Sequence, residues 1–169
     1  AEVLRAPDLR DAWQPIRFGE EAYTVSSVGE LWLEALRHLA NDTGDARWRD
    51  VHAALVNERD EKRLQTLALG KLMDFSREAG KRLVIIVENL QMLLDDEQID
   101  RTEAWALRHT LQTEPRVMLL ASATSRFDAL ADPKQAMFDL FKVHELRPLD
   151  DDATRVLWAK ISGTELLGQ

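Results

Sequence analysis

An acid and an amide end the most apolar stretch of the sequence. Glu88 and Asn89 come directly after the run Leu83–Val87, whose side chains are all aliphatic. A carboxylate at the end of a buried strand can hold Mg²⁺ through water or orient an attacking water molecule. The pattern therefore predicts that Glu88 takes part in chemistry at a phosphate. The alternative is that the carboxylate only caps the helix that follows.

A second apolar run ends in hydroxyl side chains. Ser122 and Thr124 follow Val117–Ala121, and either hydroxyl can bind a terminal phosphate or a water molecule, or simply form a turn. A carboxylate and a hydroxyl at neighbouring strand ends form the second half of a phosphoryl-transfer site, where catalysis is mostly positioning and charge stabilisation. The first half is not in the sequence. It contains no GxxxxGK motif followed by Ser or Thr, and its seven glycines do not cluster.

Length and composition are those of one globular domain. The chain has 169 residues, of which 45% are hydrophobic and 31% charged, and its formal net charge is −8. We expect an acidic chain of this kind to make no direct contact with nucleic acid. No apolar run is long enough to span a membrane. The absence of cysteine excludes disulfides and fits a reducing compartment, so we expect a cytoplasmic protein.

The strands that would position these side chains are predicted from the apolar runs. Leu83–Val87 and Val117–Ala121 are continuous rather than alternating, which is typical of strands that are covered on both faces in a parallel sheet. Trp13–Phe18 is a shorter candidate, and Pro15 places it at an edge of the sheet. Phe141–Leu146 is predicted to be one more short strand.

Helical patterns separate the strands. The strongest start signals are a capping residue followed three positions later by a glutamate, and the clearest stop signal is a glycine: Ser27 with Glu30, Asp100 with Glu103, and Gly80. The acidic run Asp150–Asp152 is predicted to open a last helix, because carboxylates suit the positive end of a helix. Residues 1–9 are expected to end another helix near Pro7.

Strands that alternate with helices indicate an α/β fold with an open parallel sheet flanked by helices. In such sheets, ligands bind beyond the carboxyl ends of the strands. Glu88, Asn89, Ser122 and Thr124 all lie at these ends. We therefore expect the four side chains to face one shared crevice.

Several segments resemble P-loop ATPases of the AAA+ and STAND (NB-ARC-like) type, in the same order along the chain. Leu83–Asn89 is similar to the Walker B strand, and Val117–Thr124 to the strand that ends in sensor 1. WQPIRFGEEAYTVSSVGELWLEAL resembles the second strand and helix of that family, and FKVHELRPLDDDATRVLW the passage from its core into its lid. The resemblance implies a three-layer domain that is cut just after Walker A and lacks its first strand. Residues 1–149 would form the core and residues 150–169 the start of the lid.

The resemblance also implies roles for single residues. Glu88 would coordinate Mg²⁺ through water, and Asn89 stands where the family usually has a second acid. Sensor 1 falls on Ser122 or Thr124, and Arg126 resembles an arginine that STAND proteins place near the γ-phosphate. ATP and Mg²⁺ are thus the implied cofactors of the intact protein. The part present here is expected to bind neither by itself.

Two functions stay open at this point. The first is an ATP-binding and ATP-hydrolysing domain, in which hydrolysis is expected to be slow because Asn89 and Gln91 replace acids of the family. The second is a non-catalytic interaction domain that keeps the sheet and has abandoned its nucleotide site. We expect protein partners or self-association in either case. A GxxxxGK motif followed by Ser or Thr, shortly before Ala1, would favour the first function.

Overall fold

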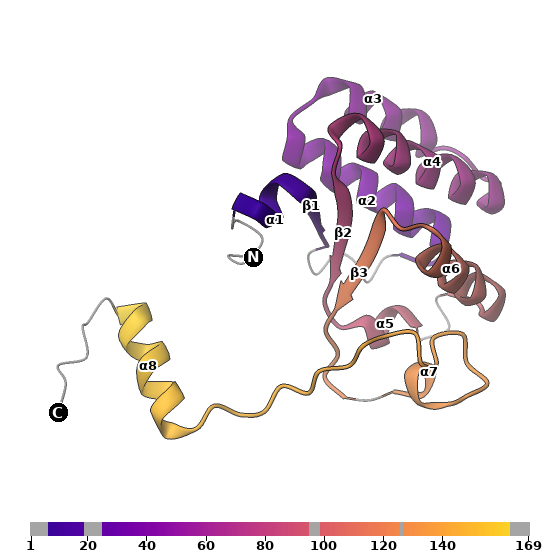
Figure 1. The fold of residues 1–169 in the computed structure, drawn as a ribbon. Coiled ribbons are helices and arrows are strands. Elements are labelled where there is room, and N and C mark those ends of the chain that lie inside the picture. Colours follow the sequence, from indigo (N-terminus) through magenta and orange to yellow (C-terminus); the bar gives the residue numbers. More distant parts are fainter. Residues whose placement is uncertain (1–6, 19–24, 95–98, 126, 163–169) are drawn as a thin grey trace.

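A computed structural model describes residues 7–18, 25–94, 99–125 and 127–162. Within these residues, three parallel strands form a sheet in the spatial order β1 (Trp13–Arg17), β2 (Arg82–Val87) and β3 (Val117–Ala121). The register sets Val87 opposite Ala121, so β2 and β3 end at the same level. The fold is α/β, with an open parallel sheet flanked by helices, as the sequence predicts (Figure 1).

The central strand is β2, and β1 lies at one edge. Four residues of β2 are almost fully buried, because strands flank it on both sides: Leu83, Val84, Ile85 and Val87. Pro15 is tolerated in β1, because that strand pairs on one side only and its ladder loses little from a missing N–H. The predicted adjacency of the two apolar runs and the edge position of the first strand are both confirmed.

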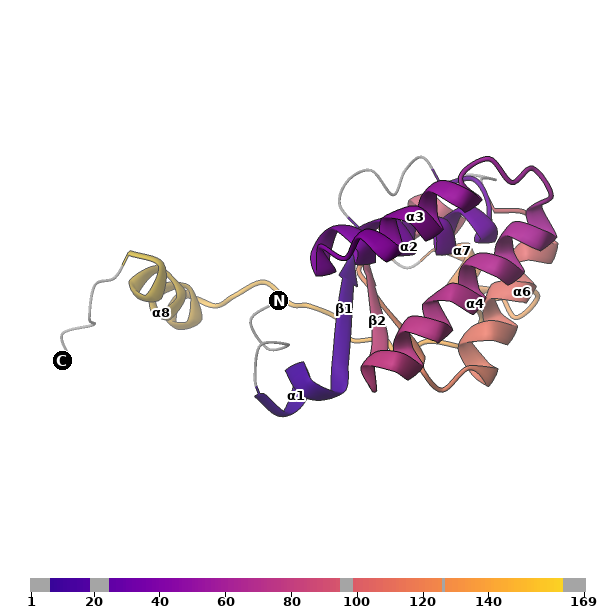
Figure 2. The same cartoon turned by 90° about the horizontal axis from the view of Figure 1, so that it is seen from above.

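One face of the sheet is covered by long helices. Figures 1 and 2 show α2 (Val28–Thr43), α4 (Glu61–Ala79) and α6 (Arg101–Thr113) on this side, with α3 (Ala46–Leu55) packed on α2 and α4. The apolar core lies between these helices and the sheet, and its fully buried members include Ile16, Leu31, Trp32, Leu36, Leu39, Leu72, Leu83, Ile85 and Leu107. Removing this apolar surface from water is the main stabilising contribution to the domain.

The predicted helix ends form as the sequence indicates. Ser27 Oγ accepts the Glu30 N–H at 3.0 Å at the start of α2, and Asp100 Oδ1 accepts the Glu103 N–H at 2.9 Å at the start of α6. Both bonds satisfy a backbone donor that has no partner inside the helix. Gly80 ends α4 with a φ of 66°, a conformation in which a residue with a Cβ would be strained.

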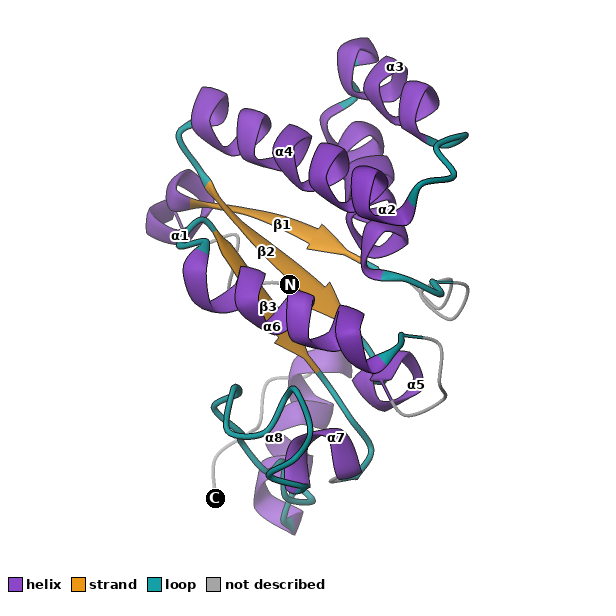
Figure 3. Cartoon of the chain, turned by 90° about the vertical axis from the view of Figure 1, so that its right-hand side faces the viewer, coloured by secondary structure: helices purple, strands orange, loops and turns teal. Residues whose placement is uncertain are grey.

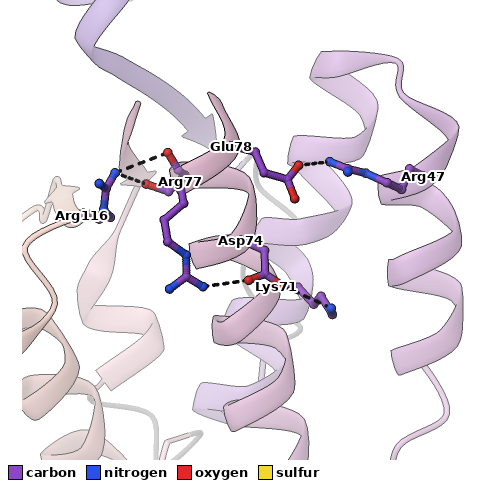
Figure 4. A network of polar contacts seen from close by, with 7 residues as sticks. Arg47, Lys71, Asp74, Arg77, Glu78 and Arg116 are labelled. Carbon is purple, nitrogen blue, oxygen red and sulfur yellow. Dashed lines mark hydrogen bonds and ion pairs between the residues drawn. The ribbon is translucent and has the colours of Figure 1, made fainter. Parts of the chain in front are cut away.

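Polar contacts on the outer surface of α4 add to this packing (Figure 4). Arg47 of α3 forms an ion pair with Glu78, while Asp74 lies between Lys71 at 3.3 Å and Arg77 at 2.8 Å. The hydrogen bond from Arg77 is the largest cause that holds the pKa of Asp74 below its usual range. All of these pairs are open to solvent, so each contributes little to stability.

The prediction that the first helix ends near Pro7 is wrong. Helix α1 spans Pro7–Ala12. Proline is favoured in the first turn of a helix, because the N–H groups there have no intrahelical acceptor and its fixed φ suits the helix. Residues 1–6, which the prediction also covered, lie outside the described part of the chain.

The strand predicted at Phe141–Leu146 is also wrong. This segment pairs with none of the three strands, and residues 142–150 have no regular structure before α8 (Asp151–Ser162) begins. A strand needs a neighbour that offers backbone partners, and apolar alternation alone does not supply one. The last helix does begin at the acidic run: Asp150 Oδ1 accepts the Ala153 N–H at 2.7 Å. Figure 1 shows α8 at a distance from the sheet.

The other face of the sheet is bare at β3, although Val84 of β2 is fully buried there. Among the described elements, α1 lies on that side near the start of β1, and α8 stands away from the sheet on the same side (Figures 1 and 2). Met118 and Leu120 of β3 point away from the helical layer and are 41% and 51% exposed. The described residues therefore form two layers, the sheet and the helices on one face, rather than the predicted three. Within the same residues β3 pairs only with β2.

Candidate functional site

The carboxyl ends of β2 and β3 meet at one place, as predicted. The chain leaves β2 through Asn89, whose φ of 54° is a left-handed conformation that asparagine tolerates better than most residues. This turn leads directly into α5 (Leu90–Leu94), a short helix that the sequence analysis did not predict. Two backbone hydrogen bonds tie the turn to the other strand end. The Ser122 N–H donates to the Val87 carbonyl at 3.0 Å, and the Leu90 N–H donates to the Ser122 carbonyl at 2.8 Å.

Two further hydrogen bonds end on hydroxyl oxygens. The backbone N–H of Asn89 donates to Ser122 Oγ at 3.4 Å, and the side-chain amide of Gln91 donates to Thr124 Oγ1 at 3.2 Å. Three predicted site residues, Asn89, Ser122 and Thr124, therefore lie together beyond the carboxyl ends of β2 and β3. Figure 3 shows α5 beyond the carboxyl end of β2. Both hydroxyl residues are exposed, so a ligand could reach them.

Glu88 is the exposed acid at this edge. It directly follows β2, and its side chain has no hydrogen bond or ion pair with any residue that the structure describes. The first turn of α5 is instead closed by its own backbone, with the Met92 N–H donating to the Asn89 carbonyl at 2.9 Å. The alternative that Glu88 caps the following helix thus finds no support in the contacts.

The site contains one carboxylate rather than a protein cage for a metal ion. No group of three or more histidine or acidic side chains that could hold a metal ion occurs in the described part of the chain. Mg²⁺ does not require such a group, because it commonly keeps several waters and binds one or two carboxylates together with substrate phosphates. Glu88 fits that requirement. Arg126, the predicted γ-phosphate contact, lies outside the described residues.

Gln91, near the carboxyl ends of β2 and β3, has a half-satisfied side-chain amide. It stands where the sequence analysis noted an amide in place of an acid. Its Nε2 contacts Thr124, whereas its Oε1 is buried and has no hydrogen-bond partner within the described part of the chain. A buried acceptor without a partner costs on the order of 1–3 kcal/mol. The sequence gives the identity of this residue, but not its contact with Thr124, which depends on the turn at Asn89.

A cavity of about 330 Å³ lies away from these strand ends, between α6 and the segment around α7 (Asp128–Ala131). The two charged residues in its wall already have structural partners. Asp100 caps α6, and Arg101 donates to the Lys134 carbonyl at 3.2 Å. It includes none of the predicted site residues, so we do not assign it to the same site.

None of the described helices combines the length and the apolar character needed to cross a membrane. Comparisons of the chain with protein-family models, with curated proteins and with solved structures find no match. The functional assignment therefore depends on the residues themselves and on the geometry of the strand ends.

Proposed function

We propose that this chain is the part of a P-loop ATPase domain of the AAA+/STAND type that follows the phosphate-binding loop. The observation that carries the proposal is that Glu88 follows the central strand at the end of the sheet where two exposed hydroxyl residues, Ser122 and Thr124, follow the next strand. The parallel order of the strands supports it, because ligands of such sheets collect at their carboxyl ends.

The free edge of β3 gives the proposal a place for the missing strand. Within the described residues β3 pairs with β2 alone, and its two outward side chains, Met118 and Leu120, are exposed. In the resembled family, the strand before Walker A lies directly beside the sensor 1 strand. A strand in that position would bring a phosphate-binding loop to the carboxyl ends of the strands, where Glu88, Ser122 and Thr124 lie. Residues 1–149 would then form most of the core, and α8 would start the lid in residues 150–169.

In the proposed domain, ATP binds between the upstream loop and these strand ends. Mg²⁺, held by the Glu88 carboxylate through water, would neutralise charge on the phosphates. Thr124 or Ser122 would donate a hydrogen bond to the terminal phosphate or to the attacking water, and Arg126 would contact the γ-phosphate. Asn89 cannot act as a base. Its backbone N–H instead holds Ser122 in place.

A non-catalytic interaction domain is the second candidate. The observation that favours it is the exposed apolar strand β3, with Met118 and Leu120 open to a protein partner. The two functions differ in what the site must do, so nucleotide hydrolysis separates them.

The test is made in the longer protein, expressed with the coding region upstream of Ala1. We expect Glu88→Gln to abolish ATP hydrolysis or to slow it at least tenfold, and to leave most of the nucleotide binding in place, because the phosphate loop supplies that binding. Glu145→Gln is the matched control, since Glu145 is exposed and lies outside the site. A parental rate for Glu88→Gln would leave Glu88 without a catalytic role.

A calorimetric titration of the present 169-residue chain with Mg-ATP completes the test. We expect weak or undetectable binding, because the chain lacks the backbone amides and the lysine that cradle the phosphates. Tight binding would show that the nucleotide site is built in another way. An upstream region without a GxxxxGK motif followed by Ser or Thr would favour the interaction domain.

A further inference from the structure

One side-chain hydrogen bond connects the helix after β2 with the loop after β3. Gln91 is the second residue of α5, and its Nε2 donates to Thr124 Oγ1 at 3.2 Å. The two residues are 33 positions apart in the sequence, so the contact exists only because β2 and β3 pair in parallel and end at the same level. Gln91 is half-buried and Thr124 is exposed at the edge of the sheet.

The direction of this hydrogen bond decides what the Thr124 hydroxyl can do. A hydroxyl has one proton to donate and lone pairs that accept. Because Gln91 supplies an N–H, the oxygen of Thr124 is the acceptor, and its own proton stays available for a ligand. Ser122 is arranged in the same way, since its Oγ accepts the backbone N–H of Asn89 at 3.4 Å. The complementary ligand of two such hydroxyls is an oxygen that accepts, as in phosphate.

The amide of Gln91 contacts Thr124 through its nitrogen. Gln91 Oε1 is buried and accepts no hydrogen bond from the residues that the structure describes, which is unfavourable. Glutamate has the same shape but no donor, and the Thr124 hydroxyl would turn its proton toward that carboxylate. An amide at this position therefore leaves the hydroxyl proton free, whereas an acid would take it.

We propose that Gln91 is a positioning residue of the phosphate site. Its amide holds Thr124 so that the hydroxyl proton points to the terminal phosphate of the bound nucleotide or to the water that attacks it. This inference rests on the proposed ATPase function and deepens it. Gln91 stands where the resembled family has an acid, and its amide would orient the hydroxyl of Thr124.

The decisive variant is Gln91→Glu in the longer protein, compared with Thr124→Ala and with the double variant. We expect Gln91→Glu to lower kcat by about as much as Thr124→Ala, roughly 3- to 100-fold for the loss of one hydrogen bond, with KM for ATP changed less than twofold. The double variant should lose no more than Thr124→Ala alone, because both changes remove the same donated proton.

Gln112→Glu is the matched control. Gln112 is exposed on α6, and its replacement adds the same charge at a distance from the site. Thermal unfolding of the 169-residue chain with and without Gln91→Glu checks that the variant folds. A parental kcat for Gln91→Glu, or a further loss in the double variant, overturns the inference. If Glu88→Gln still abolishes hydrolysis in that case, the ATPase proposal survives. A parent protein that does not hydrolyse ATP overturns both.

Discussion

The two faces of the sheet are covered by other elements to different degrees. On the helical face, Leu83, Ile85 and Val87 of β2 are at most 1% exposed beneath α2, α4 and α6. On the opposite face, Val84 of β2 is also buried, but Met118 and Leu120 of β3 are 41% and 51% exposed. The two faces are built from the same kind of residue, because both strands are continuous apolar runs. The difference shows that an apolar sequence predicts a strand covered by other elements, but does not show whether those elements are present.

This comparison bears directly on the proposed function. An apolar strand with a free edge offers unpaired backbone groups to any neighbouring strand, and proteins commonly protect such edges with charge, proline or a covering element. β3 contains neither a charged residue nor proline, since its sequence is VMLLA, and no further strand pairs with it in the described part of the chain. The bare face and the free edge lie at the same strand, which is where the proposed upstream strand would pair.

The largest expected effect is the difference between a leucine on each face. Leu83→Ala should lower the free energy of unfolding by about 2–5 kcal/mol, because the side chain is fully buried and its removal leaves a cavity. Leu120→Ala should cost less than about 1 kcal/mol, since half of that side chain already meets solvent. Urea unfolding of both variants measures the two values. Equal losses would show that the second face is covered in solution.

The covered face is the part of the molecule that the sequence predicts well. The run Leu83–Val87 and the cap at Ser27 are decided by local chemistry, and both are confirmed. Phe141–Leu146 fails because a strand also needs a partner, and the local pattern cannot show whether one is present. Pro7 fails because a proline that ends one helix and a proline that begins the next look alike in isolation.

The candidate site was predictable to a similar extent. Glu88, Ser122 and Thr124 could be placed at one edge because parallel strands bring their carboxyl ends together. The contact between Gln91 and Thr124 could not, because it depends on the left-handed turn at Asn89 and on the start of α5 one residue later. This turn is accompanied by two backbone hydrogen bonds, from Leu90 to Ser122 and from Ser122 to Val87, which join residues far apart in the sequence and which no local pattern reveals.

Two glycines sharpen the comparison inside the helical layer. A Cβ on Gly29 would lie 2.3 Å from Glu61 Oε1, which accepts the Gly29 N–H at 2.7 Å. Gly29→Ala should therefore cost about 1–3 kcal/mol through the displaced carboxylate and its lost hydrogen bond. Gly70 has open space around it in α4, and Gly70→Ala should stabilise the chain by about 0.5–1 kcal/mol. Thermal unfolding measures both changes, and a harmless Gly29→Ala would mean that Glu61 moves aside freely.

The free edge of β3 should make the chain associate with itself. Leu120→Lys places a charge on the bare face, and we expect it to weaken self-association at least about tenfold, or 1.4 kcal/mol. Val56→Lys is the matched control, because Val56 is 52% exposed, close to the 51% of Leu120, and lies at the end of α3. Light scattering over a range of concentrations gives the association constants. A parent chain that stays strictly monomeric and unfolds cooperatively would contradict the expectation.

The smallest expected effect is a pH dependence within the helical layer. Burial is the first cause that raises the pKa of Glu103 on α6, and the charges of Glu61, Asp100 and Glu30 add to it, while a hydrogen bond from the Val28 N–H opposes it. The folded chain therefore binds a proton at Glu103 more readily than the unfolded chain does. The stability that this proton contributes is full below the unfolded pKa and is lost as the pH rises through the raised folded pKa.

Glu103→Gln should remove that dependence, because the amide stays neutral. We expect the variant to gain stability relative to the parent at neutral pH, and the gain to shrink as the pH falls through the raised pKa. Glu145→Gln, which also removes one negative charge but lies outside the helical layer, controls for the net charge of the chain. Urea unfolding at several pH values between 4 and 7 measures the differences, which should be modest because solvent reaches Glu103. A gain that grows toward acid pH would have the opposite sign and would show that the carboxylate of Glu103 is stabilised by the N-terminus of α2 more than it is penalised by its acidic neighbours.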